Sequence, residues 1–193
     1  GDPYHDPFSG GRQMNCHFST PFFDQGTWLS QTTRKNSSSD ISPTGGQMPR
    51  MLGLAYASKL YRHSEALAKW DKSDLFSKKG NEVVFGTIGN ASTSEGLFWE
   101  SLNAAGVLQV PLLLCIWDDE YGISVPNAHQ MVKADLSKIL SGFQKEGEGS
   151  GIRIYTVKGY NYKELIATFA KATDECRRLH IPCVVHVTHL TQP

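Results

Sequence analysis

One stretch of the chain decides the fold: residues 82–96 read EVVFGTIGNASTSEG. Its first part, Glu82 to Ile88, is short and rich in β-branched and aromatic residues, and it lies between Gly80-Asn81 and Gly89-Asn90. Such a run is typical of a buried strand. The small residues that follow lead directly into helical periodicity from Ser94 to Leu108. The sequence therefore predicts a strand, a tight turn and a helix in succession.

Strands and helices alternate along the rest of the chain. The apolar patterns predict helices at residues 48–62, 135–145 and 162–179, and strands at residues 111–117, 152–157 and 183–187. The run at 111–117 is almost continuously apolar, as expected where helices cover both faces of a parallel strand. This alternation predicts an α/β fold with a doubly wound, mostly parallel sheet and helices on both faces. Ligands bind at the carboxyl ends of such strands, in the loops that follow them.

Size and composition favour one folded, soluble domain. We expect a single domain over residues 1–193, in which residues 1–43 form an extended, loop-rich segment. Lys plus Arg and Asp plus Glu both number 19, and no dense basic run occurs, which argues against nucleic acid and anionic membranes as partners. The longest apolar stretch, Val110 to Trp117, is far shorter than the roughly 20 residues that a membrane span needs.

The cysteines and the first residue bear on cellular context. Cys16, Cys115, Cys176 and Cys183 form no C-x-x-C pair, which favours reduced thiols in an intracellular protein, and we expect a cytoplasmic location. The sequence begins at Gly1 without an initiator Met or an apolar leader. We therefore expect a piece of a longer protein without a visible targeting signal.

The turn at residues 89–96 is a candidate anion site. Its small residues, Gly89, Ala91 and Ser92 among them, would let backbone N–H groups approach a phosphate, and the helix N-terminus adds partial positive charge. A structural turn without a ligand is the alternative. The glycines of residues 147–151 precede a strand instead of a helix, so we interpret that patch as a linker.

The loop after the next strand is acidic. Residues 117–126 read WDDEYGISVP, with Asp118, Asp119 and Glu120 at the expected carboxyl end of a buried strand. Crowding three acidic side chains together is costly unless water solvates them or a cation neutralises them. The loop is therefore either a metal site or an acidic, solvent-exposed turn.

Together the two loops resemble the cofactor motif of thiamine-diphosphate enzymes, and among these the α-type half of pyruvate and branched-chain 2-oxo acid dehydrogenases. The resemblance implies the thiamine-diphosphate-binding fold, in its diphosphate-binding domain. In that family a Gly-Asp-Gly opens the motif and an Asn-Asn pair closes it. The Asp, the second Asn and a backbone carbonyl hold the magnesium that grips the diphosphate. In this chain the matching positions are Asn90, Asp119 after 29 residues, and the carbonyl of Tyr121.

The carboxylate and the amide have thus exchanged places. Magnesium requires a near-octahedral shell of hard oxygens, and both groups offer one. The ligand count and formal charge are unchanged, so we predict a magnesium site at Asn90, Asp119 and Tyr121, with an affinity that the exchange leaves open. The prediction requires Asn90 and Asp119 to lie close enough to share one cation beside a cavity. Where the family often has an Arg that contacts diphosphate, this chain has Trp117 or Asp118.

Two upstream segments extend the resemblance. Residues 42–47 read SPTGGQ and resemble the family's Ser-Ser-Pro segment, which implies that Ser42 and Thr44, with Ile123, touch the cofactor largely through backbone groups. Without the resemblance, the Ser-Pro pair would be interpreted as a helix start.

Residues 9–18 read SGGRQMNCHF and resemble a Gly-Arg-Gln-Met segment, which makes His17 a candidate to polarise a 2-oxo acid. A hydrogen-bonded bystander is the alternative for that histidine. The full predicted cofactor set is Ser42, Thr44, Gly89, Asn90, Ala91, Ser92, Asp119, Tyr121 and Ile123.

The resemblance also implies a reaction and partners. The family uses thiamine diphosphate and magnesium to decarboxylate a 2-oxo acid oxidatively and passes the acyl group to lipoyl. The expected partners are a β-type half, fused or separate, and a lipoyl-bearing acyltransferase, in an oligomer. The Gly-Arg-Gln-Met and Ile-Ser-Val-Pro segments favour branched-chain 2-oxo acids. Because the family's histidine loop and activating Glu lie outside this chain, we expect it to catalyse poorly alone. We also expect the chain to be a fragment of a fused α–β protein.

Two alternative functions remain open. With Asn90 in place of Asp, the chain could be a non-catalytic cofactor-binding or interaction module with a degenerate metal site. A nicotinamide-dependent oxidoreductase on a similar sheet is the other alternative, and it predicts a G-x-G-x-x-G turn after a strand. No such turn follows any strand predicted here.

Overall fold

The structure is a computed structural model of the chain that describes residues 19–33, 35–38 and 43–190. Two predicted site residues, His17 and Ser42, lie outside these ranges, as does Cys16.

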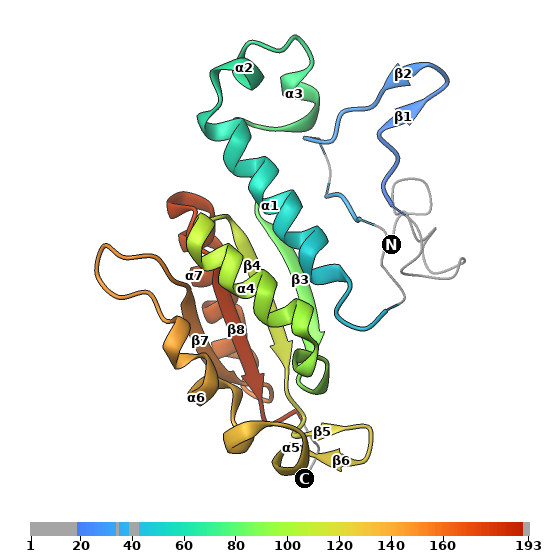
Figure 1. Cartoon of the computed structure of the whole chain (residues 1–193). Coiled ribbons are helices and arrows are strands. Elements are labelled where there is room, and N and C mark those ends of the chain that lie inside the picture. The colour runs from blue at the N-terminus through green and yellow to red at the C-terminus, as the bar shows by residue number, and fades with distance from the viewer. Residues whose placement is uncertain (1–18, 34, 39–42, 191–193) are drawn as a thin grey trace.

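A four-stranded parallel sheet forms the centre of the molecule (Figure 1). Its strands, in spatial order, are β3 (Val84–Gly89), β4 (Leu112–Trp117), β8 (Cys183–Thr188) and β7 (Arg153–Lys158). The pairing is parallel throughout, so all four carboxyl ends lie at one edge of the sheet. All four strands coincide with predicted ones to within two residues, and the predicted α/β fold with a parallel sheet is confirmed.

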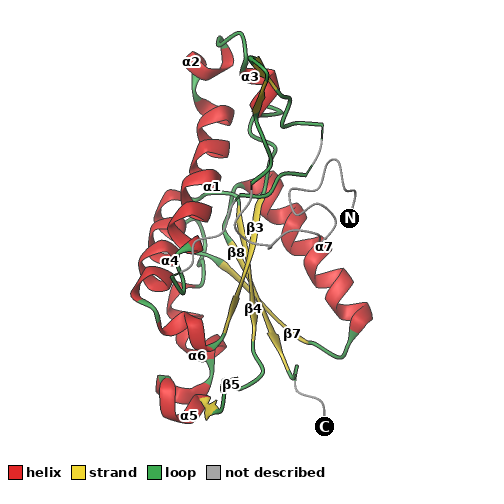
Figure 2. Cartoon of the chain, turned by 90° about the vertical axis from the view of Figure 1, so that its right-hand side faces the viewer, coloured by secondary structure: helices red, strands yellow, loops and turns green. Residues whose placement is uncertain are grey.

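Helices cover both faces of the sheet. Figure 2 shows α1 (Gln47–His63), α4 (Gly96–Leu108) and α6 (Leu136–Leu140) on one side and α7 (Tyr162–Leu179) on the other. Successive residues of β4 therefore point into two different cores. Leu112, Leu114 and Ile116 pack with the α1 and α4 side. Leu113 and Cys115 pack with the α7 side.

Shorter elements connect these layers. They are β1 (Phe23–Asp24), β2 (Thr27–Trp28), α2 (Glu65–Ala68), α3 (Ser73–Phe76), η2 (Ala91–Ser94), β5 (Tyr121–Gly122), β6 (Val125–Pro126), α5 (Asn127–Gln130), η3 (Val132–Ala134) and η4 (Ser141–Phe143). The β5–β6 hairpin and α5 lie at the edge of the sheet where the strands end (Figure 1). No helix within the described ranges is both long enough and apolar enough to cross a membrane.

Two predicted helices were placed incorrectly at their ends. The helix expected from Ser94 begins at Gly96, because η2 forms first and Glu95 is extended as the N-cap residue, with φ −69° and ψ 136°. The helix expected over residues 135–145 ends at Leu140 and continues as the 3-10 turn η4. It stops there because Gln144 forms a parallel bridge with Ile152, which draws the backbone out of the helix.

Candidate functional site

An open pocket of about 860 Å³ lies at the carboxyl ends of the strands. Gly89 ends β3 and Trp117 ends β4, while Leu190 follows β8, so three strand ends border the pocket. This is the position in which parallel α/β sheets bind ligands. The other lining residues are Thr44, Asn90, Ala91, Ser92, Glu95, Asp119, Tyr121, Gly122, Ile123, Val125 and Gln130.

The pocket brings together the residues that sequence analysis selected from three separate segments. The predicted residues that line it are Thr44, Gly89, Asn90, Ala91, Ser92, Asp119, Tyr121 and Ile123. Their roles toward a cofactor remain predictions, as do those of His17 and Ser42, which lie outside the described residues. Sequence analysis did not select Glu95, Gly122, Val125, Gln130 or Leu190.

The charge of the pocket favours a cation. Glu95 and Asp119 both line it, and none of its described lining residues is Lys or Arg. A diphosphate placed here would face two carboxylates without a cationic side chain. Its charge would need a metal ion, the N-terminus of α4 or groups outside the described residues.

Asn90 holds the two loops of the pocket together. It follows β3, is 3% exposed, and its backbone N–H donates to the Trp117 carbonyl at the end of β4. Its side-chain Nδ2 donates to the Tyr121 carbonyl oxygen at 3.0 Å and to Asn127 Oδ1 at 2.7 Å. The Asn90 side chain therefore faces two oxygens. Rotating the Asn90 amide by half a turn would place its own Oδ1 beside these two oxygens. A cation could stabilise the resulting group of three oxygens.

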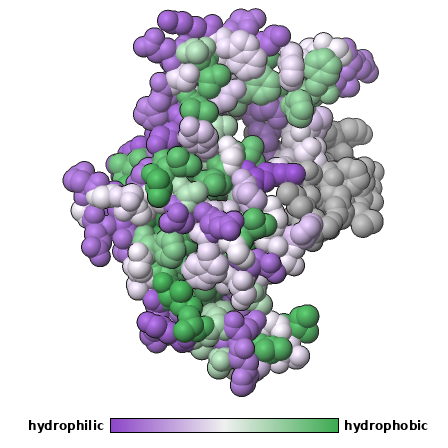
Figure 3. All heavy atoms as spheres, viewed as in Figure 1, coloured by the Kyte–Doolittle hydropathy of each residue, from purple (hydrophilic) through white to green (hydrophobic). Residues whose placement is uncertain are grey.

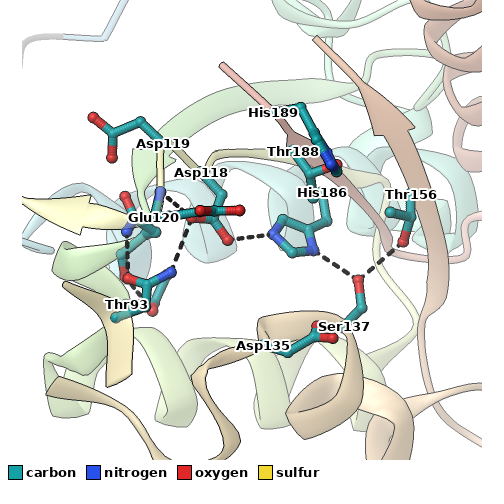
Figure 4. Close-up of polar contacts among 12 residues, drawn as sticks. Thr93, Asp118, Asp119, Glu120, Asp135, Ser137, Thr156, His186, Thr188 and His189 are labelled. Atoms are coloured by element: carbon teal, nitrogen blue, oxygen red, sulfur yellow. Dashed lines mark hydrogen bonds and ion pairs between the residues drawn. The ribbon is translucent and has the colours of Figure 1, made fainter. Parts of the chain in front are cut away.

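Asp119 contacts the same residue, Tyr121, at its backbone N–H. Its Oδ1 accepts a hydrogen bond from the Tyr121 N–H at 3.1 Å, and the side chain is exposed. Figure 4 shows its carboxylate turned away from that of Asp118. The side chains of Asn90 and Asp119 thus both contact Tyr121, and the two line one cavity. That they share one cation stays a prediction.

These groups fit a magnesium ion chemically. An amide oxygen, a carboxylate and a backbone carbonyl are hard oxygen ligands of the kind that magnesium prefers. Within the described ranges, no three His, Cys, Asp or Glu side chains gather as a metal site. The set at Asn90, Asp119 and Tyr121 contains only one such side chain, so its fit depends on the amide and the carbonyl.

Asp118, the first acid of the loop, points inward instead. It is 4% exposed, and its Oδ2 lies 2.8 Å from Nε2 of His186 on β8. Its Oδ1 accepts from the Glu120 N–H at 2.9 Å and from Asn127 Nδ2 at 3.1 Å. Burial alone would raise the pKa of this carboxyl. The hydrogen bonds from His186, Glu120 and Asn127 outweigh burial and hold its pKa below the ordinary value.

The other nitrogen of His186 is also engaged. Nδ1 lies 2.6 Å from Ser137 Oγ, which lies 2.9 Å from Thr156 Oγ1 (Figure 4). Thr156 lines a second pocket of about 440 Å³ at the ends of β7 and β8. Serine hydrolases also align serine, histidine and aspartate. Here the Ser137 hydroxyl is engaged by Thr156 and His186 is 2% exposed, so the arrangement favours a structural role.

The β5–β6 hairpin is strained and apolar. Ile123 has φ +59° at the turn and is fully exposed, although β-branched residues rarely adopt positive φ. Figure 3 shows apolar side chains gathered over this end of the molecule, where Tyr121, Ile123 and Val125 are exposed. Backbone strain of this kind, about 1–3 kcal/mol, is concentrated at ligand sites. The strained turn lines the pocket.

Comparison with known proteins gives a consistent family match. The sequence profile described as "Dehydrogenase E1 component" matches residues 25–189. The chain is 27% identical over 181 residues to the 2-oxoisovalerate dehydrogenase subunit alpha of Bacillus subtilis, an alignment that covers 93% of this chain and 44% of that protein. It is 24% identical over 143 residues to the pyruvate dehydrogenase E1 component subunit alpha of Rickettsia bellii, covering 74% of this chain and 36% of that protein. The chain thus spans less than half the length of these relatives.

A solved structure supports the fold. Transketolase from Campylobacter jejuni superposes with a TM-score of 0.54 at 17% sequence identity, covering 75% of this chain and 20% of the transketolase chain. At that identity the likeness concerns the arrangement of sheet and helices alone.

Proposed function

Because the chain belongs to the dehydrogenase E1 component family, we propose that it forms the diphosphate- and metal-binding half of a thiamine-diphosphate-dependent 2-oxo acid dehydrogenase, as the α-type component. The observation that carries the proposal is the pocket at the ends of β3 and β4. Residues of the turn at 89–92 and of the loop at 119–125 line it together, and the Asn90 amide contacts the Tyr121 carbonyl inside it.

The proposed roles follow from the positions of the groups. The Asn90 side-chain oxygen, the Asp119 carboxylate and the Tyr121 carbonyl would hold magnesium. The turn through Ala91 and Ser92 would receive the diphosphate beside the N-terminus of α4. When bound, thiamine diphosphate supplies the carbanion chemistry that removes carbon dioxide from a 2-oxo acid. The chain's own contribution is to bind and orient the cofactor and to neutralise its charge.

We propose a branched-chain 2-oxo acid as the substrate and lipoyl as the acyl acceptor. Support for the substrate comes from the Ile-Ser-Val-Pro segment at 123–126 and from the alignment with the 2-oxoisovalerate subunit, which covers more of the chain than the alignment with the pyruvate subunit. The proposed partners are a β-type half, which would supply the rest of the active site, and a lipoyl-bearing acyltransferase. The chain spans 44% of the 2-oxoisovalerate relative, so we propose that it works as one part of a larger assembly. The absence of a C-x-x-C pair among its cysteines supports a proposed cytoplasmic location.

Thermal unfolding tests the binding function directly. The chain is melted alone, with thiamine diphosphate, with magnesium and with both. Because a ligand at 100 times its dissociation constant stabilises the folded state by about 2.7 kcal/mol, a joint rise in melting temperature is expected that neither ligand gives alone. Thiamine monophosphate is the control, since it lacks the second phosphate. No shift at millimolar concentrations would favour a non-catalytic module with a degenerate site.

Catalysis is tested in the presence of a β-type half. Carbon dioxide release from 3-methyl-2-oxobutanoate is compared with release from pyruvate, with an artificial electron acceptor. Faster turnover of the branched substrate is expected. Faster turnover of pyruvate would contradict the proposed substrate and leave the cofactor assignment intact.

A further inference from the structure

A continuous chain of side-chain hydrogen bonds runs from β7 to the loop that follows β4. It begins at Thr156, passes through Ser137 on α6 and His186 on β8, and reaches Asp118 at the end of β4. Figure 4 shows the His186 ring between the Ser137 hydroxyl and the Asp118 carboxylate. Because both ring nitrogens are engaged, the orientation of the imidazole is fixed.

Asp118 in turn holds the loop that carries two predicted metal ligands. Its Oδ1 accepts from the Glu120 N–H near the start of the loop and from the Asn127 side chain just beyond its end. The Asn127 backbone N–H donates to the Glu120 carbonyl and closes the same loop. Asp119 and Tyr121 lie inside it, so the Asp118 carboxylate bonds to both ends of the segment that presents them.

Asn127 connects this carboxylate to the third predicted ligand. Its Nδ2 donates to Asp118 at 3.1 Å, while its Oδ1 accepts from Asn90 Nδ2 at 2.7 Å. Asn127 is 4% exposed, so these bonds do not compete with bulk water. The orientation of the Asn90 amide is therefore coupled to Asp118 through a single side chain.

A buried ion pair is by itself weak evidence of a gain in stability. A buried carboxylate is costly to desolvate, and well-packed apolar residues in place of a buried ion pair are often neutral or stabilising. Buried polar networks that are fully satisfied do, however, specify one geometry. Asp118 accepts three hydrogen bonds from three separate residues, which is the arrangement expected of a side chain that holds the loop in one conformation.

We propose that Asp118 and His186 are a positioning pair for the cofactor pocket: His186 fixes Asp118, and Asp118 fixes the 119–126 loop and the Asn90 amide. The inference rests on the proposed function and adds two residues that do not line the pocket. Neither is a catalytic residue, because Asp118 acts through Glu120 and Asn127, and His186 acts through Asp118.

The matched variants are Asp118→Asn and Asp118→Ala. An amide at 118 keeps Oδ1 as an acceptor for Glu120 and Asn127. Its Nδ2 can donate to His186 Nε2, provided that the ring moves its proton to Nδ1 and donates to Ser137. Asp118→Asn therefore preserves the geometry, whereas Asp118→Ala and His186→Phe break it.

Two measurements distinguish the effect of the pair on loop order from its effect on cofactor binding. The first is amide hydrogen exchange of residues 119–127 without any ligand, which reports loop order alone. We expect exchange to be at least tenfold faster in Asp118→Ala and His186→Phe, and unchanged within about threefold in Asp118→Asn. The second is the dissociation constant for thiamine diphosphate with magnesium, which should follow the same order by similar factors.

Leu112→Ala is the control for general destabilisation. Leu112 is buried at the opposite end of β4, so its truncation lowers stability without touching the network. Slow exchange and tight binding in Asp118→Ala and His186→Phe would overturn the proposal, as would a loss in Leu112→Ala equal to theirs. Failure of the unmodified chain to bind the cofactor would overturn the proposed function instead, and the exchange result would still test the pair.

Discussion

The side-chain amide of Asn90 donates a hydrogen bond to the carbonyl oxygen of Tyr121 across 3.0 Å and so joins the end of β3 to the β5–β6 hairpin. A proton on nitrogen occupies the place where the proposed function requires a cation. The hydrogen bond and the metal ion are therefore alternatives, because the Asn90 amide can turn either its nitrogen or its oxygen toward the Tyr121 carbonyl.

Asn90→Asp should make folding depend on magnesium. A carboxylate cannot donate, so at position 90 it would face the Tyr121 and Asn127 oxygens without a proton between them. Because the group is charged, this costs more than the penalty of about 1–3 kcal/mol for an unpaired neutral group. A cation among these oxygens would remove that cost. Urea unfolding with chelator and with magnesium measures the difference. Asn90→Ala is the control, since it loses the bonds without adding charge. Equal stability of Asn90→Asp in both buffers would contradict the magnesium site.

Asp119→Asn should weaken magnesium binding and leave the metal-free fold intact. Asp119 carries the only formal charge among the three predicted ligands, so we expect at least a tenfold loss of affinity, or about 1.4 kcal/mol. Its side chain is exposed, and metal-free stability should change by less than about 0.5 kcal/mol. Glu120→Gln removes the neighbouring exposed charge and serves as the control. Calorimetric titration with magnesium in the presence of cofactor gives both values. Similar losses in the two variants would indicate only a general charge effect.

Much of the fold could be predicted because its strands are locally distinct. Residues 112–117 are apolar at every position and residues 183–188 are nearly so. This pattern is typical of strands that are buried on both faces. The pocket could be located as well, because neighbouring parallel strands end at the same edge of the sheet. The turn after Ile88 and the loop after Trp117 were therefore expected to lie side by side. These conclusions require only periodicity and topology.

The different roles of the three acids could not be predicted. Asp118, Asp119 and Glu120 are alike in sequence, yet only Asp118 is buried. Its partner His186 is 68 residues away, and β8 reaches it only because β8 lies between β4 and β7. The available signal was His186 itself, the one polar residue of the predicted strand at 183–187, which must find a partner when buried. Asn127, which links the network to Asn90, gives no such signal in its turn-rich surroundings.

The buried thiols should be unreactive in the native state. Burial raises the pKa of the Cys115 thiol to about 12. A hydrogen bond with Cys183 and burial both raise the pKa of Cys176. At about pH 8 almost none of Cys115 or Cys176 is thiolate, which is the reactive form. Cys183 is 1% exposed and therefore inaccessible to reagent. A Cys16→Ser variant should therefore resist alkylation until urea is added, and then react at three cysteines. Mass spectrometry counts the adducts. Rapid native modification of Cys115 would show that β4 is not buried as described.

Acid should destabilise the fold partly through His180. Burial lowers the pKa of this histidine, its hydrogen bond to the Gly80 carbonyl acts in the opposite direction, and nearby cations such as Arg62 lower the pKa further. As pH falls below about 6.5, the unfolded chain binds a proton that the folded chain resists. The stability that is present above that pH is therefore lost as pH falls toward the folded-state pKa.

His180→Asn should reduce this pH dependence. Asn does not titrate and tolerates the left-handed backbone at this position, where φ is 53°. Free energies of unfolding are measured between about pH 7.5 and 5.5, and the decrease should be smaller than in the unmodified chain. His189→Asn is the matched control, because His189 has φ 56° but is exposed. An identical slope in His180→Asn and the unmodified chain would contradict the assigned pKa shift.

Gly80→Ala should be among the most destabilising single substitutions in the chain. Gly80 has φ +69°, and an added Cβ would lie 2.7 Å from the Arg62 backbone nitrogen and against the Ser58 carbonyl oxygen. The left-handed backbone and the overpacking together should cost about 2–5 kcal/mol. The substitution would also disturb the hydrogen bond that Arg62 donates to the Gly80 carbonyl.

Gly26→Ala isolates the backbone effect, because Gly26 has φ +83° with nothing within 4 Å of an added Cβ. Urea denaturation should therefore find Gly80→Ala less stable than Gly26→Ala by at least about 1 kcal/mol. Equal losses would mean that α1 can shift away from residue 80, against the close packing described here.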